Sequence, residues 1–192
     1  MEFYVSSNAS PFTDALAWSG LEAFRDGFWP AWESDHPDAD AGYGRIAYAS
    51  LLSGITLAQA GLGSVHGLAS PLGAYFPIPH GVVCGTLVAE ATAMNIQALR
   101  EREPDSPALK KYARIGGLLS QTDDAGDAHA ADALILLLRK WLERLDLPRL
   151  GSYGMREQHL EKIAANSRGG SMKTNPLVLT DDELMALLRS RM

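Results

Sequence analysis

Two histidines in the middle of the chain have side chains that can bind a metal or transfer a proton. His66 and His80 are fourteen positions apart, and each is followed by a glycine. Pro77 and Pro79 lie between them, and proline cannot continue a helix that has already begun. We therefore expect one helix to end near Phe76 and the next to start with Pro79 in its first turn. The two imidazoles then come from different helices, a common way to bring them to one point.

These residues alone leave two interpretations open, because two hydrogen-bonded core histidines are as common as half of a site. No HExxH, CxxC or glycine-rich phosphate loop accompanies them, and GLGSVHG follows a predicted helix rather than a strand. Cys84 would share a helix face with His80. A lone cysteine in the apolar run GVVCGTLVAEA is, however, more typical of a small core residue.

The other polar features favour surface roles. His36 lies in an acidic loop and His129 near the acidic start of a predicted helix, so both are expected to be solvent-exposed. His159 has charged neighbours. Gly170-Ser171-Met172-Lys173 suggests an anion site, but a surface turn is the more usual meaning of such a stretch.

Composition places limits on the class of protein. The chain has 192 residues, 46% of them hydrophobic and 21% charged, which suits one globular domain with a real core. A net charge of −6 argues against a nucleic-acid surface. A single cysteine excludes an intrachain disulfide and is typical of a reducing, cytoplasmic setting. We expect no signal peptide and no run near the ~18 apolar residues that a membrane span needs.

Hydrophobic periodicity predicts helices throughout and gives no alternating strand or internal repeat. We expect an all-α domain of seven to eight helices over residues 1–192, after a short extended or turn segment at the N-terminus. Residues 43–60 carry one charge and many small side chains, which predicts a central, buried helix. Thr180 to Glu183 form a predicted capping box for the last helix. The expected helices span about 11–32, 43–60, 80–102, 108–120, 130–146, 155–167 and a final one after 180.

Three segments resemble the iron-containing (group III) alcohol dehydrogenases. GLGSVHGLASPLGAYFPIPHGVVCGTLVAEATAMN resembles the family pattern of G-x-x-H, A-x-P-L-G, P-H-G and a helix ending in Asn. EFYVSSNASPFTDALAWSGLEAF resembles the E-x-Y…N-P-x-T-D-x-L-A segment of the family, and SMKTNPLVLTDDELMALL is similar to its closing segment. The resemblance covers essentially the whole chain.

The resemblance implies an all-helical, metal-binding half of a two-domain fold, related to the dehydroquinate synthase-like fold. The other half of that fold is a Rossmann-like nucleotide-binding domain. In the family, one aspartate and three histidines hold Fe²⁺ or sometimes Zn²⁺, and the two later histidines correspond to His66 and His80. Counting back from Glu2 places the aspartate and the first histidine before Met1. Ser64 and Ser70 would shape the cleft, and Ser70 stands where many members carry a further histidine.

The function implied by the resemblance is NAD(P)-dependent interconversion of a small alcohol and an aldehyde or ketone, with the metal as Lewis acid. We expect this chain alone to be inactive, with any metal weakly held by two imidazoles. One alternative is a non-catalytic helical assembly module, including a homodimer. A second is the maleylacetate reductase branch of the family. No nucleic-acid or membrane partner is expected.

Overall fold

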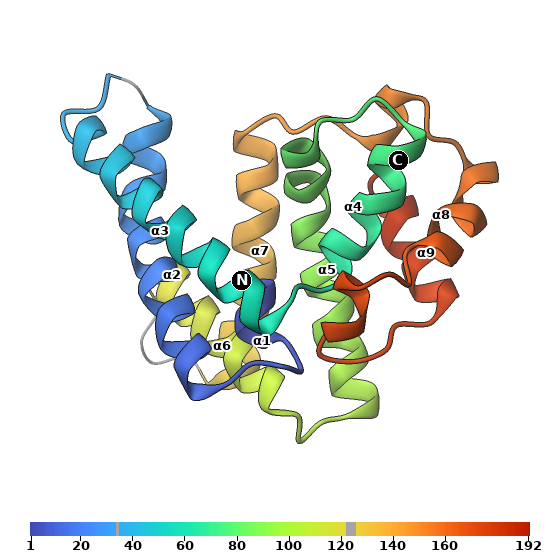
Figure 1. Cartoon of the computed structure of the whole chain (residues 1–192), viewed down its shortest axis with the longest axis horizontal. Coiled ribbons are helices and arrows are strands. Elements are labelled where there is room, and N and C mark those ends of the chain that lie inside the picture. The colour runs from blue at the N-terminus through green and yellow to red at the C-terminus, as the bar shows by residue number, and fades with distance from the viewer. Residues whose placement is uncertain (34, 122–125) are drawn as a thin grey trace.

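In residues 1–33, 35–121 and 126–192, which this computed structural model describes, every regular element is a helix (Figure 1). The predicted all-α class is therefore confirmed. The α-helices are α1 Glu2–Val5, α2 Pro11–Trp32, α3 Ala39–Ala60, α4 Ser64–Tyr75, α5 His80–Arg102, α6 Pro107–Ser120, α7 Asp127–Arg144, α8 Leu160–Asn166 and α9 Asp181–Ser190. The 3₁₀ turns are η1 Leu150–Tyr153, η2 Glu157–His159 and η3 Ser171–Thr174.

Local sequence signals set several helix boundaries where we expected them. The side chain of Ser10 accepts a hydrogen bond from the Thr13 backbone N–H, and Pro11 opens α2. The expected capping box of Thr180 and Glu183 starts α9. Pro79 precedes α5, which begins at His80 as predicted.

The core is built around α5, which packs against α4, α7 and α9 (Figure 1). Its fully buried side chains include Val83, Leu87, Ile96 and Leu99. By length and hydropathy α5 is also able to cross a membrane, contrary to the expectation of no such apolar run, as is the bent pair of α3 and α4 taken together. Because 56% of the apolar window of α5 is buried inside the fold, its composition is also that of a core helix.

The prediction of a central helix at 43–60 is wrong. Helix α3 begins earlier, at Ala39, and packs mainly against α2, with which it forms a hairpin on one side of the molecule (Figure 1). A glycine on each helix permits the close approach: a Cβ on Gly27 of α2 would lie 2.6 Å from the Cβ of Arg45, and a Cβ on Gly42 of α3 would lie 2.7 Å from the Ala31 backbone nitrogen. The opposite face is open to solvent, with Tyr43 54% and Leu51 63% exposed.

Two further segments differ from expectation. The N-terminus forms the short helix α1, with Tyr4 and Val5 buried, rather than an extended segment. The helix predicted at 155–167 is divided into η2 and the shorter α8. The helix predicted at 130–146 begins at Asp127, and part of the link before it, at 122–125, lies outside the described residues.

Candidate metal centre

Helix α4 carries His66 in its first turn, and two distant side chains hold the start of that helix. The Ser64 N–H donates to Asn175 Oδ1 at 2.9 Å, and the Val65 N–H donates to Glu2 Oε1 at 2.8 Å. The first N–H groups of a helix have no partner within the helix, so these contacts act as caps. A Cβ on Gly63 would lie 2.8 Å from Asn175 Oδ1 and 2.9 Å from Glu2 Oε1, which explains the glycine.

A cluster of buried polar side chains stabilises the start of α4 from the interior of the fold. Asn95 on α5 donates from Nδ2 toward Ser64 Oγ at 3.3 Å and toward Tyr112 Oη at 3.2 Å. The Asn175 amide donates to Asn95 Oδ1 at 2.8 Å. Burial raises the pKa of the Tyr112 phenol above its ordinary value. These hydrogen bonds join α4, α5 and α6 to the segment after η3. Separating any of these segments would leave buried polar groups without a partner, which is costly.

The two serines expected to shape the cleft occupy different environments. Ser64 is fully buried and belongs to the polar cluster rather than to an open cleft wall. Ser70 is exposed on α4, one turn after His66. Only Ser70 therefore has a side chain at the surface.

Glu2 also orients the His66 ring. Its Oε2 lies 2.5 Å from His66 Nδ1, while its other oxygen caps α4. A carboxylate on one ring nitrogen is the usual partner of a metal-binding histidine, because it fixes the tautomer and leaves the other nitrogen free. The E-x-Y motif drew attention to Glu2 as an alignment point of the resemblance, but the contact of Glu2 with His66 was not predicted.

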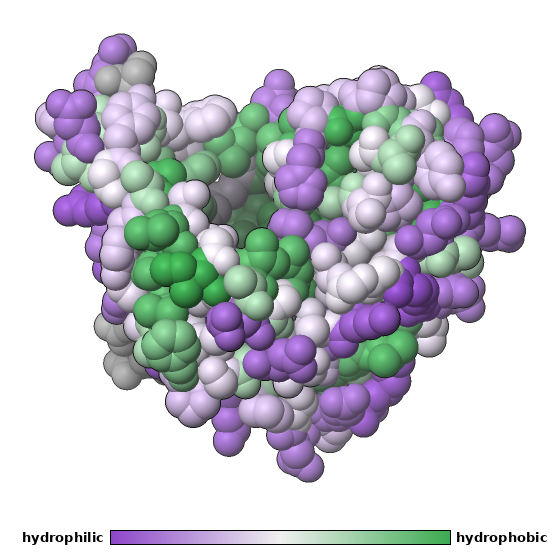
Figure 2. Space-filling model, viewed as in Figure 1, coloured by the Kyte–Doolittle hydropathy of each residue, from purple (hydrophilic) through white to green (hydrophobic). Residues whose placement is uncertain are grey.

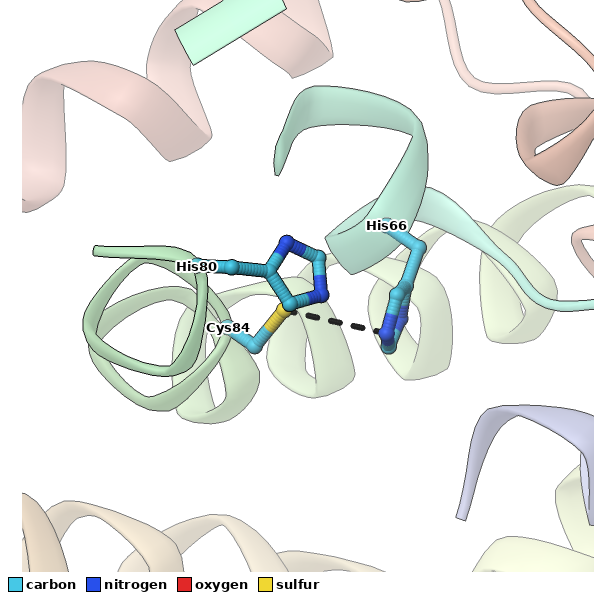
Figure 3. A group of neighbouring side chains, drawn as sticks. All are labelled: His66, His80 and Cys84. Atoms are coloured by element: carbon cyan, nitrogen blue, oxygen red, sulfur yellow. Dashed lines mark hydrogen bonds between the residues drawn. The ribbon is translucent and has the colours of Figure 1, made fainter. Parts of the chain in front are cut away.

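His80 and Cys84 face His66 from α5 (Figure 3). The ring centroids of His66 and His80 are 5.4 Å apart. Cys84 Sγ lies 3.5 Å from His80 Nε2 and 3.7 Å from His66 Nε2. The cysteine is half-buried and packs against the core, in agreement with its interpretation as a core residue, and its sulfur also faces both rings.

The three side chains fit a divalent metal by their chemistry. One ligand atom from each lies within 4.8 Å of the others, and this is the one such group of His, Cys, Asp or Glu in the described ranges. Bonds of about 2.0–2.3 Å in a tetrahedral site place neighbouring ligand atoms about 3.3–3.8 Å apart. The two sulfur–nitrogen distances lie in this range.

The remaining histidines lie elsewhere. His129 is exposed near the start of α7, as expected. His36 accepts a hydrogen bond from the Asp38 N–H in the loop before α3, and is half-buried rather than fully exposed. His159 packs edge-on against Phe76.

A largely apolar cavity of about 280 Å³ is lined in part by α5, the helix that carries His80 and Cys84, although none of the three candidate ligands lines it. Gly85, the neighbour of Cys84, lines it together with residues of α2 and α7. Figure 2 shows the surface hollowed between the α2–α3 hairpin and the other helices. The lining also includes Leu21, Phe24, Phe28, Val88, Leu138, Trp141 and Leu142.

The contacts of His66 predict how the metal-free chain responds to pH. Its hydrogen bonds to the Cys84 sulfur and to Glu2 raise the pKa of His66 from 6.5 to about 10, against the opposing effect of burial. A raised pKa means that protonated His66 stabilises the fold fully below about pH 6.5, and that this contribution is lost as pH rises toward 10. Chemical denaturation in chelator across this range is expected to show that loss.

Glu2→Gln should flatten that decline and move the NMR titration of His66 toward pH 6.5. Glu161→Gln, which removes an exposed carboxylate on α8, is the matched control and should leave both unchanged. Parallel denaturation curves for all three proteins would contradict the pairing of Glu2 with His66.

Comparison with known proteins identifies the fold. The model of the "Fe-containing alcohol dehydrogenase family, C-terminal" matches residues 1–192. Alcohol dehydrogenase 4 of Schizosaccharomyces pombe is 28% identical, with 100% of this chain and 43% of that protein covered. An NADPH-dependent butanol dehydrogenase of Clostridium saccharobutylicum is 27% identical, with 96% of this chain and 45% of that protein covered.

Solved structures agree with this match. The crystal structure of a 1,3-propanediol oxidoreductase aligns with a TM-score of 0.86 at 26% identity, over 100% of this chain and 48% of that one. The chain thus spans just under half the length of each of these relatives. The helices described above correspond to the C-terminal half of the fold. This chain therefore belongs to the Fe-containing alcohol dehydrogenase family, of which it represents the helical C-terminal part.

Proposed function

We propose that the chain is the metal-binding part of an NAD(P)-dependent alcohol dehydrogenase, with His66 and His80 as ligands of Fe²⁺ or Zn²⁺. The observation that carries this proposal is that both imidazoles meet at one point while Glu2 orients one of them. A bound divalent metal supplies a Lewis acid at the oxygen of an alcohol or aldehyde, and NAD(P) carries the hydride.

The residues of the chain itself have separate tasks in this proposal. Glu2 holds the His66 ring and its tautomer through Nδ1. His80, exposed at the start of α5, leaves the site open to an entering molecule. The cavity beside Gly85 is lined mostly by apolar side chains, which suits the carbon chain of a small alcohol and excludes water from it. Because the thiol of Cys84 stands among the ligands, a reducing compartment such as the cytoplasm is the setting we propose.

Metal binding is the first test of this function. Adding Zn²⁺ to the metal-free chain should raise its melting temperature, since a ligand present at 100 times its Kd stabilises the folded state by about 2.7 kcal/mol. His66→Ala and His80→Ala should lose most of this increase, while His129→Ala, which removes an exposed histidine on α7, should keep it. An equal increase in all four proteins would exclude the pair as ligands.

The isolated chain is proposed to be inactive as a dehydrogenase. The described ranges hold no strand and so no Rossmann-like sheet, and the whole relatives are more than twice as long. Purified protein loaded with Fe²⁺ or Zn²⁺ should not oxidise NADPH with butanal above background. An intact two-domain relative serves as the positive control, and turnover comparable to that relative would refute the prediction.

A second candidate function, a helical assembly module, is favoured by the exposed face of α3. Tyr43, Tyr48, Leu51 and Ile55 are large apolar residues that are 41–63% exposed on this helix. Contiguous apolar patches of this kind mark protein–protein contact surfaces.

This candidate predicts self-association through α3. Light scattering at high protein concentration should detect a species larger than the 20.7 kDa chain. Leu51→Lys should shift the protein to the monomer, whereas Val178→Lys, at an apolar residue 80% exposed outside α3, should not. A strict monomer for the unaltered chain would count against the assembly function and leave the metal-binding proposal intact.

A further inference from the structure

We propose that Cys84 is a third metal ligand, so that His66, His80 and Cys84 form a two-histidine, one-cysteine site that prefers zinc to iron. This inference rests on the proposed role of the two histidines as ligands and goes beyond it. The resemblance placed two ligands in this chain, whereas the side chains place three donors of suitable type around one point.

The position of Cys84 on α5 makes its convergence with both rings a consequence of helix geometry. It lies one turn after His80, so the two side chains share a face of the helix. That face meets the first turn of α4, where His66 is held by Glu2. The Cys84 sulfur lies within 3.7 Å of the Nε2 atoms of both rings, although the rings belong to separate helices (Figure 3).

The free nitrogens agree with this role. His66 uses Nδ1 for Glu2, which leaves Nε2 facing Cys84. His80 likewise directs Nε2 toward the sulfur. Imidazole nitrogen and cysteine thiolate are both ligands that occur in protein zinc sites. His80 is exposed, so this side of the group is accessible to solvent.

The donor set favours zinc over iron for two reasons. A thiolate is a soft ligand, and together with two imidazoles it matches the preferences of Zn²⁺. For a given set of nitrogen and sulfur ligands, affinity also rises from Fe²⁺ to Zn²⁺. On binding, the metal displaces the thiol proton of Cys84, and any proton carried by Nε2 of either imidazole, to solvent, and no electron is transferred.

Cys84 is the only cysteine of the chain, so any thiolate signal belongs to it. The test uses the full chain, freed of metal and kept under reductant, with Co²⁺ as a spectroscopic substitute for zinc. The unaltered chain should show sulfur-to-cobalt charge-transfer absorption in the near ultraviolet. Cys84→Ser should lose this absorption and bind Zn²⁺ at least about tenfold more weakly in a competition titration. Bound Zn²⁺ should also protect Cys84 from alkylation, as measured by mass spectrometry.

Circular dichroism and the melting temperature of metal-free Cys84→Ser and Cys84→Ala establish that both variants fold. His129→Ala serves as a control with full cobalt absorption. If the unaltered chain binds Zn²⁺ through His66 but shows no charge-transfer band, and Cys84→Ser binds as tightly, the third ligand is refuted and the two-histidine proposal stands. If the unaltered chain binds neither Co²⁺ nor Zn²⁺, both proposals fail.

Discussion

The two caps on the first turn of α4 are the contacts on which the rest of the site depends. Glu2 comes from one end of the chain and Asn175 from near the other, and they accept the Val65 and Ser64 N–H groups. Helix α4 begins at this point because the two side-chain oxygens accept hydrogen bonds from backbone N–H groups that have no partner within the helix. The same carboxylate of Glu2 then sets the His66 ring, so the anchor of the helix and the orientation of the ligand are one interaction.

The buried amides extend that anchor to α5. Asn95 lies in the body of α5 and bonds Asn175, which in turn caps α4. Through Asn95 and Asn175, the helix that carries His66 is held in register with the helix that carries His80 and Cys84. A buried polar cluster of this kind specifies one arrangement, because every slip would leave amide groups unpaired. The ligand side chains can therefore lie at the solvent edge while their positions are determined in the interior.

Local signals in the sequence were sufficient to predict the fold class and many helix boundaries. They did not predict which helices contact one another. The prolines around residue 78 and the capping box at Thr180 act on neighbouring residues, and the starts of α5 and α9 were predicted from them. The prediction that residues 43–60 form a central, buried helix was wrong. Small side chains indicate a close contact between helices, but they do not indicate how many helices make that contact. Only the fold shows that α2 is the main partner of α3.

In the site, too, local patterns were predicted and contacts between distant residues were not. His66 and His80 were found by their spacing, and the structure brings them together. Glu2 and His66, which are in contact, are 64 positions apart in the sequence, and Ser64 and Asn175, which share a hydrogen bond, are 111 positions apart. Residue patterns carry no signal of a contact at such separations. Cys84 was visible as a neighbour of His80 on a helix face, but its approach to His66 depends on how α4 crosses α5. Its local surroundings in sequence therefore favoured the core.

Zinc K-edge X-ray absorption of the chain loaded with one equivalent of Zn²⁺ tests the central claim most directly, because it reports the ligand atoms themselves. The arrangement of His66, His80 and Cys84 predicts one sulfur at about 2.3 Å together with nitrogen or oxygen neighbours at about 2.0–2.1 Å. The nitrogen shell should carry the outer scattering of two imidazoles. A zinc shell of nitrogen and oxygen alone, with no sulfur, would contradict the account.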